Sequence, residues 1–297
     1  MKIVKLKGGL GNQMFQYAFA KLIEKKTGEE VKLDYTSYSA LKNDTVRKPR
    51  LERFNLSICS ASSKDIEKKC LLQHQGNSQA LLYKIGIYAE KTLNRKYYFE
   101  ENRAYVDTDS ILKYEYFDGY WQSYRYIEQV KDEIIKDFTP KTLSQKTTDD
   151  INMFSKQNSV FVGVRKGDYT KSKYAQRHFG SFSSDYYNTA MKKISEKTEN
   201  PIFYIFSNDI NWCKQNLALD NSFKIVYREP EQQVDDFEEL MLMSSCKHAI
   251  MVNSTYHWWG AYLIKNKNKV ICCPKKWFFD DKPIDIIPND WVVIDIV

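Results

Sequence analysis

The sequence predicts an α/β protein in which parallel β-strands alternate with helices, and the second half carries the clearest signal. Continuous apolar runs that end in polar turns occupy Ser159–Tyr169, Pro201–Asp209 and the first residues of His248–Leu263, with a further short run at Lys269–Trp277. Helical patterns separate them at Ser184–Lys197, Asn211–Leu217 and Asp235–Ser245. Uninterrupted apolar strands alternating with helices are typical of a parallel sheet covered on both faces.

The chain is long enough for two domains. It has 297 residues, of which 42% are apolar, and this length suits one large or two medium α/β domains. The polar segment Thr139–Asp150, which contains Pro140, is the best candidate for a linker. We therefore expect a first domain at 1–145 and a second at 146–297.

The first half opens with a strand, a glycine-rich turn and a helix. Ile3–Leu6 predicts a short strand, and helical spacing of apolar residues begins at Met14. The glycines between them, Gly8, Gly9 and Gly11, allow a sharp turn and a close approach to a ligand. The dinucleotide pattern G-x-G-x-x-G is excluded because Met14 stands where its third glycine belongs.

The amides of Asn12 and Gln13 follow this turn directly, and each offers both donors and acceptors. Exposed backbone N–H groups beside them would suit an anion or a sugar hydroxyl. The other interpretation is a plain strand-to-helix connection, which the glycines alone do not exclude.

Composition excludes several classes of protein. The net charge of +7 comes from 45 basic and 38 acidic residues, and the lysines are scattered, which does not favour a nucleic-acid partner. Six cysteines form no C-x-x-C pair and only four histidines are present, so we expect reduced, buried thiols and no metal site. No apolar run approaches the length of a membrane span or a signal peptide, which predicts a cytoplasmic protein.

Polar residues stand at the ends of three predicted strands. In parallel sheets, ligands bind at the carboxyl ends of strands, so these turns are expected to converge on one crevice. Arg165, Lys166 and Asp168 end the first strand and could clamp a phosphate. A surface turn with a local ion pair is the alternative.

The other two strand ends carry amides and hydroxyls. Asn208 and Asp209 suit a nucleotide base or ribose, or the cap of the following helix. Asn253, Ser254 and Thr255 precede a helix whose N-terminus would favour a phosphate, while capping is again a compatible role. The adjacent tryptophans 258 and 259 are expected in the core, because neighbouring helix residues point in different directions.

At this point the sequence resembles a known family. The segments Gly8–Ala20, Val164–Tyr169, Phe206–Asp209 and Val252–Leu263 together are similar to the family-11 glycosyltransferases. Weaker support comes from Arg50–Leu56, Gly119–Ile127 and Glu238–Ile250. These pieces are spread over nearly the whole chain in the same order.

The resemblance implies a GT-B fold, with two Rossmann-like halves facing a cleft, the acceptor side first and the GDP-sugar side second. It implies an inverting, metal-independent α-1,2-fucosyltransferase that uses GDP-fucose. Arg165 would then stabilise the leaving diphosphate, Asn12 would help to place the sugar or diphosphate, and Asp168 would be a candidate base, with His178 and His257 as weaker ones. The expected donor contacts are Gly9, Gly11, Gln13, Lys166, Asn208, Asp209, Glu239, Asn253, Ser254, Thr255, Tyr256 and His257.

Two departures from the family's pattern leave alternatives open. Where the family has a histidine two residues before its first arginine, this chain has Gly163, and Lys166 replaces the second arginine. Tyr256 and His257 replace a Phe-Ser pair. The hypotheses are therefore a fucosyltransferase acting on a surface glycan, in peripheral contact with the inner membrane leaflet, an enzyme of the same fold with another GDP-sugar, and a non-catalytic glycan-binding protein.

Overall fold

The computed structural model describes residues 1–38, 48–70, 80–166, 182–217, 222–279 and 283–295, with the backbone alone at 80–84. The chain divides into two compact units, Met1–Lys141 with Lys282–Ile286, and Thr142–Asp281 with Ile287–Val297. The short return segment joins the first unit because Asp285 accepts the backbone N–H of Tyr105 (2.8 Å) and of Tyr124 (2.9 Å). Nothing in the sequence indicated this return.

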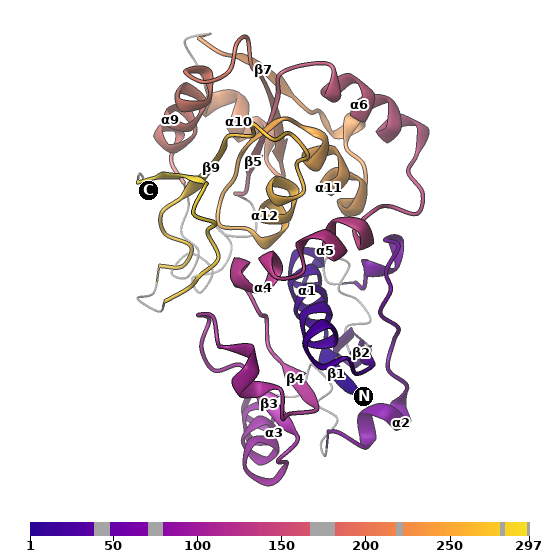
Figure 1. The fold of residues 1–297 in the computed structure, drawn as a ribbon. Coiled ribbons are helices and arrows are strands. Elements are labelled where there is room, and N and C mark those ends of the chain that lie inside the picture. The colour runs from indigo at the N-terminus through magenta and orange to yellow at the C-terminus, as the bar shows by residue number, and fades with distance from the viewer. Residues whose placement is uncertain (39–47, 71–79, 167–181, 218–221, 280–282, 296–297) are drawn as a thin grey trace. The chain divides into compact units, whose positions relative to one another are not determined.

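The first unit is built on a four-stranded parallel sheet in the order β2-β1-β4-β3. Its strands are β1 (Lys2–Lys5), β2 (Val31–Asp34), β3 (Tyr97–Phe99) and β4 (Tyr116–Asp118). One face packs against α1 (Leu10–Thr27), and the other contributes Ile3, Tyr97 and Tyr116 to a core shared with Ile66 of α2 (Ser63–Glu67). The remaining α-helices of this unit are α3 (Ala80–Leu93), α4 (Tyr124–Glu128) and α5 (Lys131–Asp137) (Figure 1).

The start of the first helix differs from the prediction. Helix α1 begins at Leu10 and not at Met14, because Gly9 acts as its N-cap, so Asn12 and Gln13 lie in the helix. Further along the chain, α4 and α5 are separate helices, since the backbone at Val130 is not helical. Ser62 is the N-cap of α2 and forms a reciprocal hydrogen-bond pair with Asp65.

The second unit contains a six-stranded parallel sheet in the order β10-β9-β8-β5-β6-β7. Its strands are β5 (Ser159–Val164), β6 (Ile202–Ser207), β7 (Lys224–Tyr227), β8 (His248–Ile250), β9 (Ile271–Pro274) and β10 (Val292–Ile294). Counted from β5, this is the doubly wound order 3-2-1-4-5-6 of a Rossmann fold. The order reverses between β5 and β8.

Helices cover both faces of this sheet. On one face Val160, Val162 and Val164 pack with buried residues of α9 (Ser184–Ser195) and α10 (Ile210–Asn216). On the other face α12 (Thr255–Tyr262) lies near Phe161 and packs against α11 (Asp236–Ser245), which in turn contacts α6 (Gln145–Ser155) (Figure 1). Short 3-10 turns occupy Thr36–Tyr38, Leu51–Arg53, Thr108–Ile111 and Pro230–Gln232.

The predicted fold class is confirmed: both units are parallel α/β sheets, the pair of Rossmann-like halves of a GT-B protein. Trp258 and Trp259 are fully buried, as predicted. All six cysteines lie in the described residues and none forms a disulfide, but Cys59 is exposed. Within the described residues, no helix is long and apolar enough to cross a membrane.

Candidate active site

The glycine turn of the first unit is shaped by Gly8. This residue has a φ of +83°, and a Cβ there would lie 2.5 Å from the Asn12 side-chain nitrogen, so glycine is required. The Asn12 oxygen accepts a hydrogen bond from the Gln122 amide at 2.9 Å. Asn12 therefore ties the start of α1 to the segment that follows β4.

The Gln13 amide binds the backbone around the glycine turn. Its side chain is fully buried. It donates to the backbone oxygens of Lys48 (2.8 Å) and Gly8 (3.2 Å) and accepts from the Arg50 N–H (3.0 Å). These contacts fix the loop around the helix start, and they use both the oxygen and the nitrogen of the Gln13 amide. Gly9 and Gly11 begin the helix beside it, as its N-cap and second residue.

The end of β5 carries two basic residues. Arg165 lies half-buried, with Nη1 3.5 Å from the Ser254 hydroxyl oxygen. Lys166 donates its backbone N–H to Asn208 Oδ1 (3.0 Å), and its ammonium contacts the Phe182 carbonyl (2.7 Å) and the Trp212 ring (3.9 Å). Burial lowers the pKa of Lys166. Asp168 and His178 lie outside the described residues.

The end of β6 is organised by local capping. Asp209 is the N-cap of α10, and its Oδ1 accepts the Trp212 N–H at 3.0 Å. Asn208 is exposed and holds the backbone of Lys166, as described above. The amide thus links the ends of β5 and β6, while the carboxylate serves its own helix.

The end of β8 leads into α12. Ser254 is the helix N-cap, with its hydroxyl accepting the His257 N–H at 3.5 Å, and Thr255 is the first helical residue. The buried Asn253 amide donates to the Trp277 carbonyl at 2.8 Å and anchors this turn. Arg165 therefore lies beside the positive end of a helix, an arrangement that favours an anion between them.

Tyr256 and His257 lie in the first turn of α12 and pack against neighbouring elements of the second unit. The Tyr256 hydroxyl donates to the Asp236 carbonyl oxygen of α11. The His257 ring is buried against β5, and a Cβ on Gly163 would lie only 2.6 Å from its Nδ1. Burial and the nearby Arg165 lower the pKa of His257 to about 3, so the imidazole is neutral at physiological pH. The two departures from the family pattern thus meet in one place.

Glu239 is paired with a cation that the sequence did not indicate. The Arg228 Nη1 lies 3.5 Å from the Glu239 Oε1, and the guanidinium stacks on the Phe206 ring at 4.5 Å. Burial raises the pKa of Glu239, which Arg228 partly offsets. Arg228 follows β7 directly. Polar residues directly after strands are site candidates. Arg228 would have been among them if Lys224–Tyr227 had been recognised as a strand.

The three strand ends meet where the strand order reverses. Strand β5 pairs with both β6 and β8, and contacts join Arg165 to Ser254 and Lys166 to Asn208. Open α/β sheets bind their ligands at such a switch point. Two cations, a helix N-terminus and hydroxyls together suit a diphosphate. Among the described residues, no group of three or more His, Cys, Asp or Glu could hold a metal ion.

Fold and site thus define a protein with two Rossmann-like units and, in the second, a strand edge whose residue types suit an anion. The family model Glycosyl transferase family 11 matches residues 1–295, and the chain belongs to this family. It is therefore a glycosyltransferase.

Three related proteins are similar to this chain in sequence. The chain is 30% identical to the alpha-1,2-colitosyltransferase of Escherichia coli, over 99% of this chain and 98% of that protein. It is 28% identical to the O-antigen biosynthesis glycosyltransferase WbnK of Escherichia coli, over 97% and 98%. It is 27% identical to galactoside alpha-(1,2)-fucosyltransferase 1 of Ateles belzebuth, over 54% of this chain and 46% of that protein.

Proposed function

We propose that this enzyme is an inverting α-1,2-fucosyltransferase, which moves fucose from GDP-fucose to a galactose-type hydroxyl of a surface glycan such as an O-antigen or capsule repeat. The observation that carries the proposal is the contact between Arg165 and the N-cap Ser254 at the switch point of the second sheet. The α-1,2 linkage and the galactoside acceptor follow from the names of the relatives.

In the proposed reaction, charge develops on the leaving diphosphate. The acceptor oxygen forms a bond to C1 of fucose, the C1–O bond to the β-phosphate breaks, and its electron pair leaves with GDP. Arg165 would carry much of this charge, because its guanidinium is always protonated and presents a fork of N–H donors. The Ser254 hydroxyl and the amides at the start of α12 would hold the same phosphate.

The remaining residues have supporting roles in this proposal. Asn253 would shape the phosphate turn, and Asn208 and Lys166 would hold the neighbouring strand end. Glu239 would contact the ribose or guanine, with Arg228 fixing its carboxylate. The acceptor proton would pass to a base, for which Asp168 stays our candidate. We assign the acceptor to the first unit, with Asn12 near the transferred sugar, and the donor to the second.

Calorimetric titration with GDP-fucose, GDP-mannose and GDP in EDTA tests donor binding, and a transfer assay on lactose and N-acetyllactosamine tests the reaction. Tight, metal-free binding of GDP-fucose and transfer to O2 of galactose are expected. Arg165→Ala should lower kcat by about 10²–10³-fold, and Arg165→Lys should recover only part, since it restores charge without the fork. Failure to bind any guanine nucleotide would refute the proposal, and full activity of Arg165→Ala would remove Arg165 from its proposed role. Binding of the glycan without any transfer would favour a glycan-binding protein.

A second candidate is the transfer of colitose in place of fucose. It is favoured by the colitosyltransferase relative, which matches almost the whole chain, and by the Gly163–His257 packing next to Arg165. The same assay with nucleotide-activated colitose decides between the donors by their kcat/KM ratio. Either reaction would take place at the cytoplasmic side of a membrane, with the enzyme peripheral to the inner leaflet.

A further inference from the structure

The turn that follows β4 contains a strained backbone conformation. Trp121 has a φ of +56°, in the left-handed region, although it is a bulky residue with a fully buried side chain. Such a conformation is energetically unfavourable for a residue that carries a Cβ. The indole Nε1 is also buried without a hydrogen-bond partner among the described residues, which adds to the cost.

Several contacts force this conformation. The Glu100 carboxylate accepts the backbone N–H groups of Tyr120 (2.6 Å) and Trp121 (3.1 and 3.2 Å). The Trp121 ring stacks on Phe19 of α1, with centroids 3.8 Å apart and planes 3° apart. A Cβ at Gly119 would lie 2.6 Å from the Glu100 side chain, so only glycine fits there. The turn is over-determined, and strain that is held in this way is typical of functional sites.

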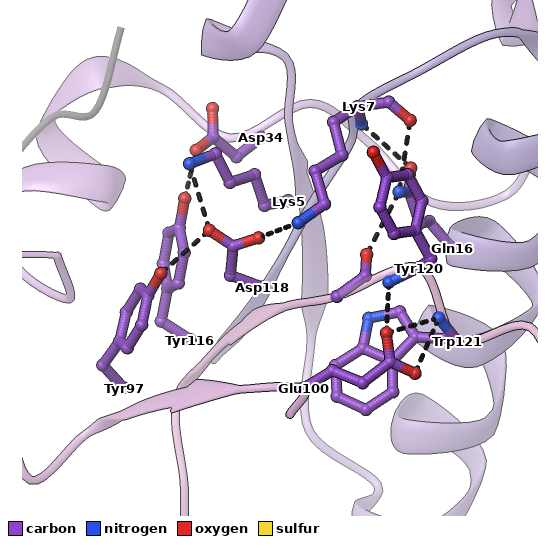
Figure 2. A network of polar contacts seen from close by, with 11 residues as sticks. Lys5, Lys7, Gln16, Asp34, Tyr97, Glu100, Tyr116, Asp118, Tyr120 and Trp121 are labelled. Atoms are coloured by element: carbon purple, nitrogen blue, oxygen red, sulfur yellow. Dashed lines mark hydrogen bonds and ion pairs between the residues drawn. The ribbon is translucent and has the colours of Figure 1, made fainter. Parts of the chain in front are cut away.

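The result of the turn is that Tyr120 faces solvent while its neighbours are buried. Its side chain is 42% exposed, whereas Trp121 and Phe117 are fully buried. The Lys7 ammonium lies 4.7 Å from the Tyr120 ring centroid. Figure 2 shows the polar contacts around β4, with Tyr120 and Lys7 close together and Glu100 and Trp121 below them. The protein thus presents an aromatic ring at the carboxyl edge of the first sheet.

This edge is also a switch point. Strand β1 pairs with β2 on one side and with β4 on the other, and the ligand crevice of an open α/β sheet is expected between such strands. The glycine turn after β1 and the turn after β4 contact each other through Asn12 and Gln122. This amide contact and the Tyr120 ring thus both follow strands that end at the carboxyl edge of the first sheet.

The charges at this edge are balanced. Lys5 and Lys7 both bind the buried carboxylate of Asp118, at 3.1 and 2.6 Å, and Glu100 supplies a second carboxylate (Figure 2). The pKa of Asp118 is lowered by the two lysines against the effect of its burial. Among the described residues, these two lysines are matched by these two carboxylates, so the edge suits a neutral ligand better than a phosphate.

We propose that Tyr120 is the platform for a galactose-type pyranose of the acceptor, whose C–H face stacks on the ring while its hydroxyls reach the amides of Gln122 and Asn12. This inference rests on the proposed function, since it places that reaction's acceptor. An aromatic ring with an apolar face and a nearby amide matches a sugar, which has an apolar C–H face and a polar rim. Tyr120 is then an acceptor-binding residue, and Glu100 and Trp121 are positioning residues.

The test compares Tyr120→Ala, Tyr120→Leu and Tyr120→Phe with the wild type. The control is Tyr88→Ala, which makes the same change on α3 at a side chain that is 70% exposed. Binding of N-acetyllactosamine in the presence of GDP is followed by saturation-transfer NMR, and the acceptor KM by the transfer assay. Tyr120→Ala and Tyr120→Leu should weaken acceptor binding about 5- to 30-fold, whereas Tyr120→Phe and Tyr88→Ala stay within about twofold of wild type.

The variants should leave GDP affinity and donor KM unchanged, which separates this proposal from the previous one. An unaltered acceptor KM in Tyr120→Ala would overturn the inference. So would a wild-type enzyme that binds GDP but no galactoside. A wild-type enzyme that binds no GDP would instead refute the proposed function. Because Tyr120→Leu keeps apolar bulk, it remains informative if Tyr120→Ala folds poorly.

Discussion

The His257 ring fills the space that a side chain at residue 163 would need. This packing predicts how Gly163→Ala changes the stability of the protein. A Cβ at residue 163 would lie 2.6, 2.7 and 2.8 Å from three ring atoms of His257, whereas non-bonded carbon contacts lie at about 3.5–4.0 Å. The ring would have to move by about 1 Å inside a buried helix–sheet interface. Overpacking of this kind costs about 1–3 kcal/mol. Gly163→Ala alone should therefore lower the free energy of unfolding by that amount.

The stability effect of Gly163→Ala should change sign when the His257 ring is absent. In a His257→Ala background the clash disappears, and alanine is about 0.5–1 kcal/mol better than glycine inside a strand. Gly163→Ala should then be neutral or stabilising by up to about 1 kcal/mol, so the two substitutions should couple by about 1–4 kcal/mol.

Guanidinium unfolding of the four proteins, followed by tryptophan fluorescence, measures this coupling. Five of the six tryptophans lie in the second unit, so the signal reports mainly on the sheet that holds Gly163. Strictly additive effects, or a Gly163→Ala protein as stable as wild type, would refute the idea that the His257 ring fills this space. Gly260→Ala, on the helix that carries His257, is a milder comparison, because the added Cβ would lie no closer than 3.0 Å to the Met243 side chain.

Three further predictions concern other parts of the molecule. Asp118→Asn leaves two lysines without their buried carboxylate and should cost about 3–5 kcal/mol in denaturant unfolding; a loss no larger than that of the exposed pair variant Asp295→Asn, about 0–1 kcal/mol, would contradict this. Because the pKa of His257 is about 3 in the folded protein and 6.5 in the unfolded one, the unfolded state binds more protons below pH 6.5, so stability falls as pH falls. Between pH 8 and pH 5 this group alone should remove about 2 kcal/mol, and a His257→Asn protein whose stability shows the same pH dependence as wild type would exclude it. Ser254→Ala should lose about 1 kcal/mol of stability as a lost N-cap and also weaken GDP binding, whereas the cap variant Ser62→Ala should lose similar stability with unchanged GDP affinity; equal GDP affinity in both would remove Ser254 from the proposed phosphate site.

The sequence by itself determined the fold class and the location of the candidate site. Apolar runs identify strands because a strand buried on both faces must be apolar throughout, and β5 and β6 were found in this way. Polar residues directly after such strands could be assigned to one edge, since parallel strands end on the same side of their sheet. Arg165, Asn208 and Ser254 were predicted together for that reason, and the structure places them around one switch point.

Tertiary structure decided which of the candidate side chains are available to a ligand. Gln13 and Asp209 were chosen for their chemistry, but the Gln13 amide and the Asp209 Oδ1 bind neighbouring backbone, which local sequence does not reveal. Arg228 was not predicted, because the strand before it, β7, is only partly buried and lacks a strong apolar pattern.

The strained turn at Trp121 and the exposure of Tyr120 also belong to the tertiary structure. Both arise from contacts with Glu100 and Phe19, which are 21 and 102 residues away along the chain. The same is true of Gly163 and His257, two isolated departures from a family pattern that become one packed pair in the folded protein. Periodicity and local motifs report on the faces of single elements, and only the packed chain sets which of those faces meet.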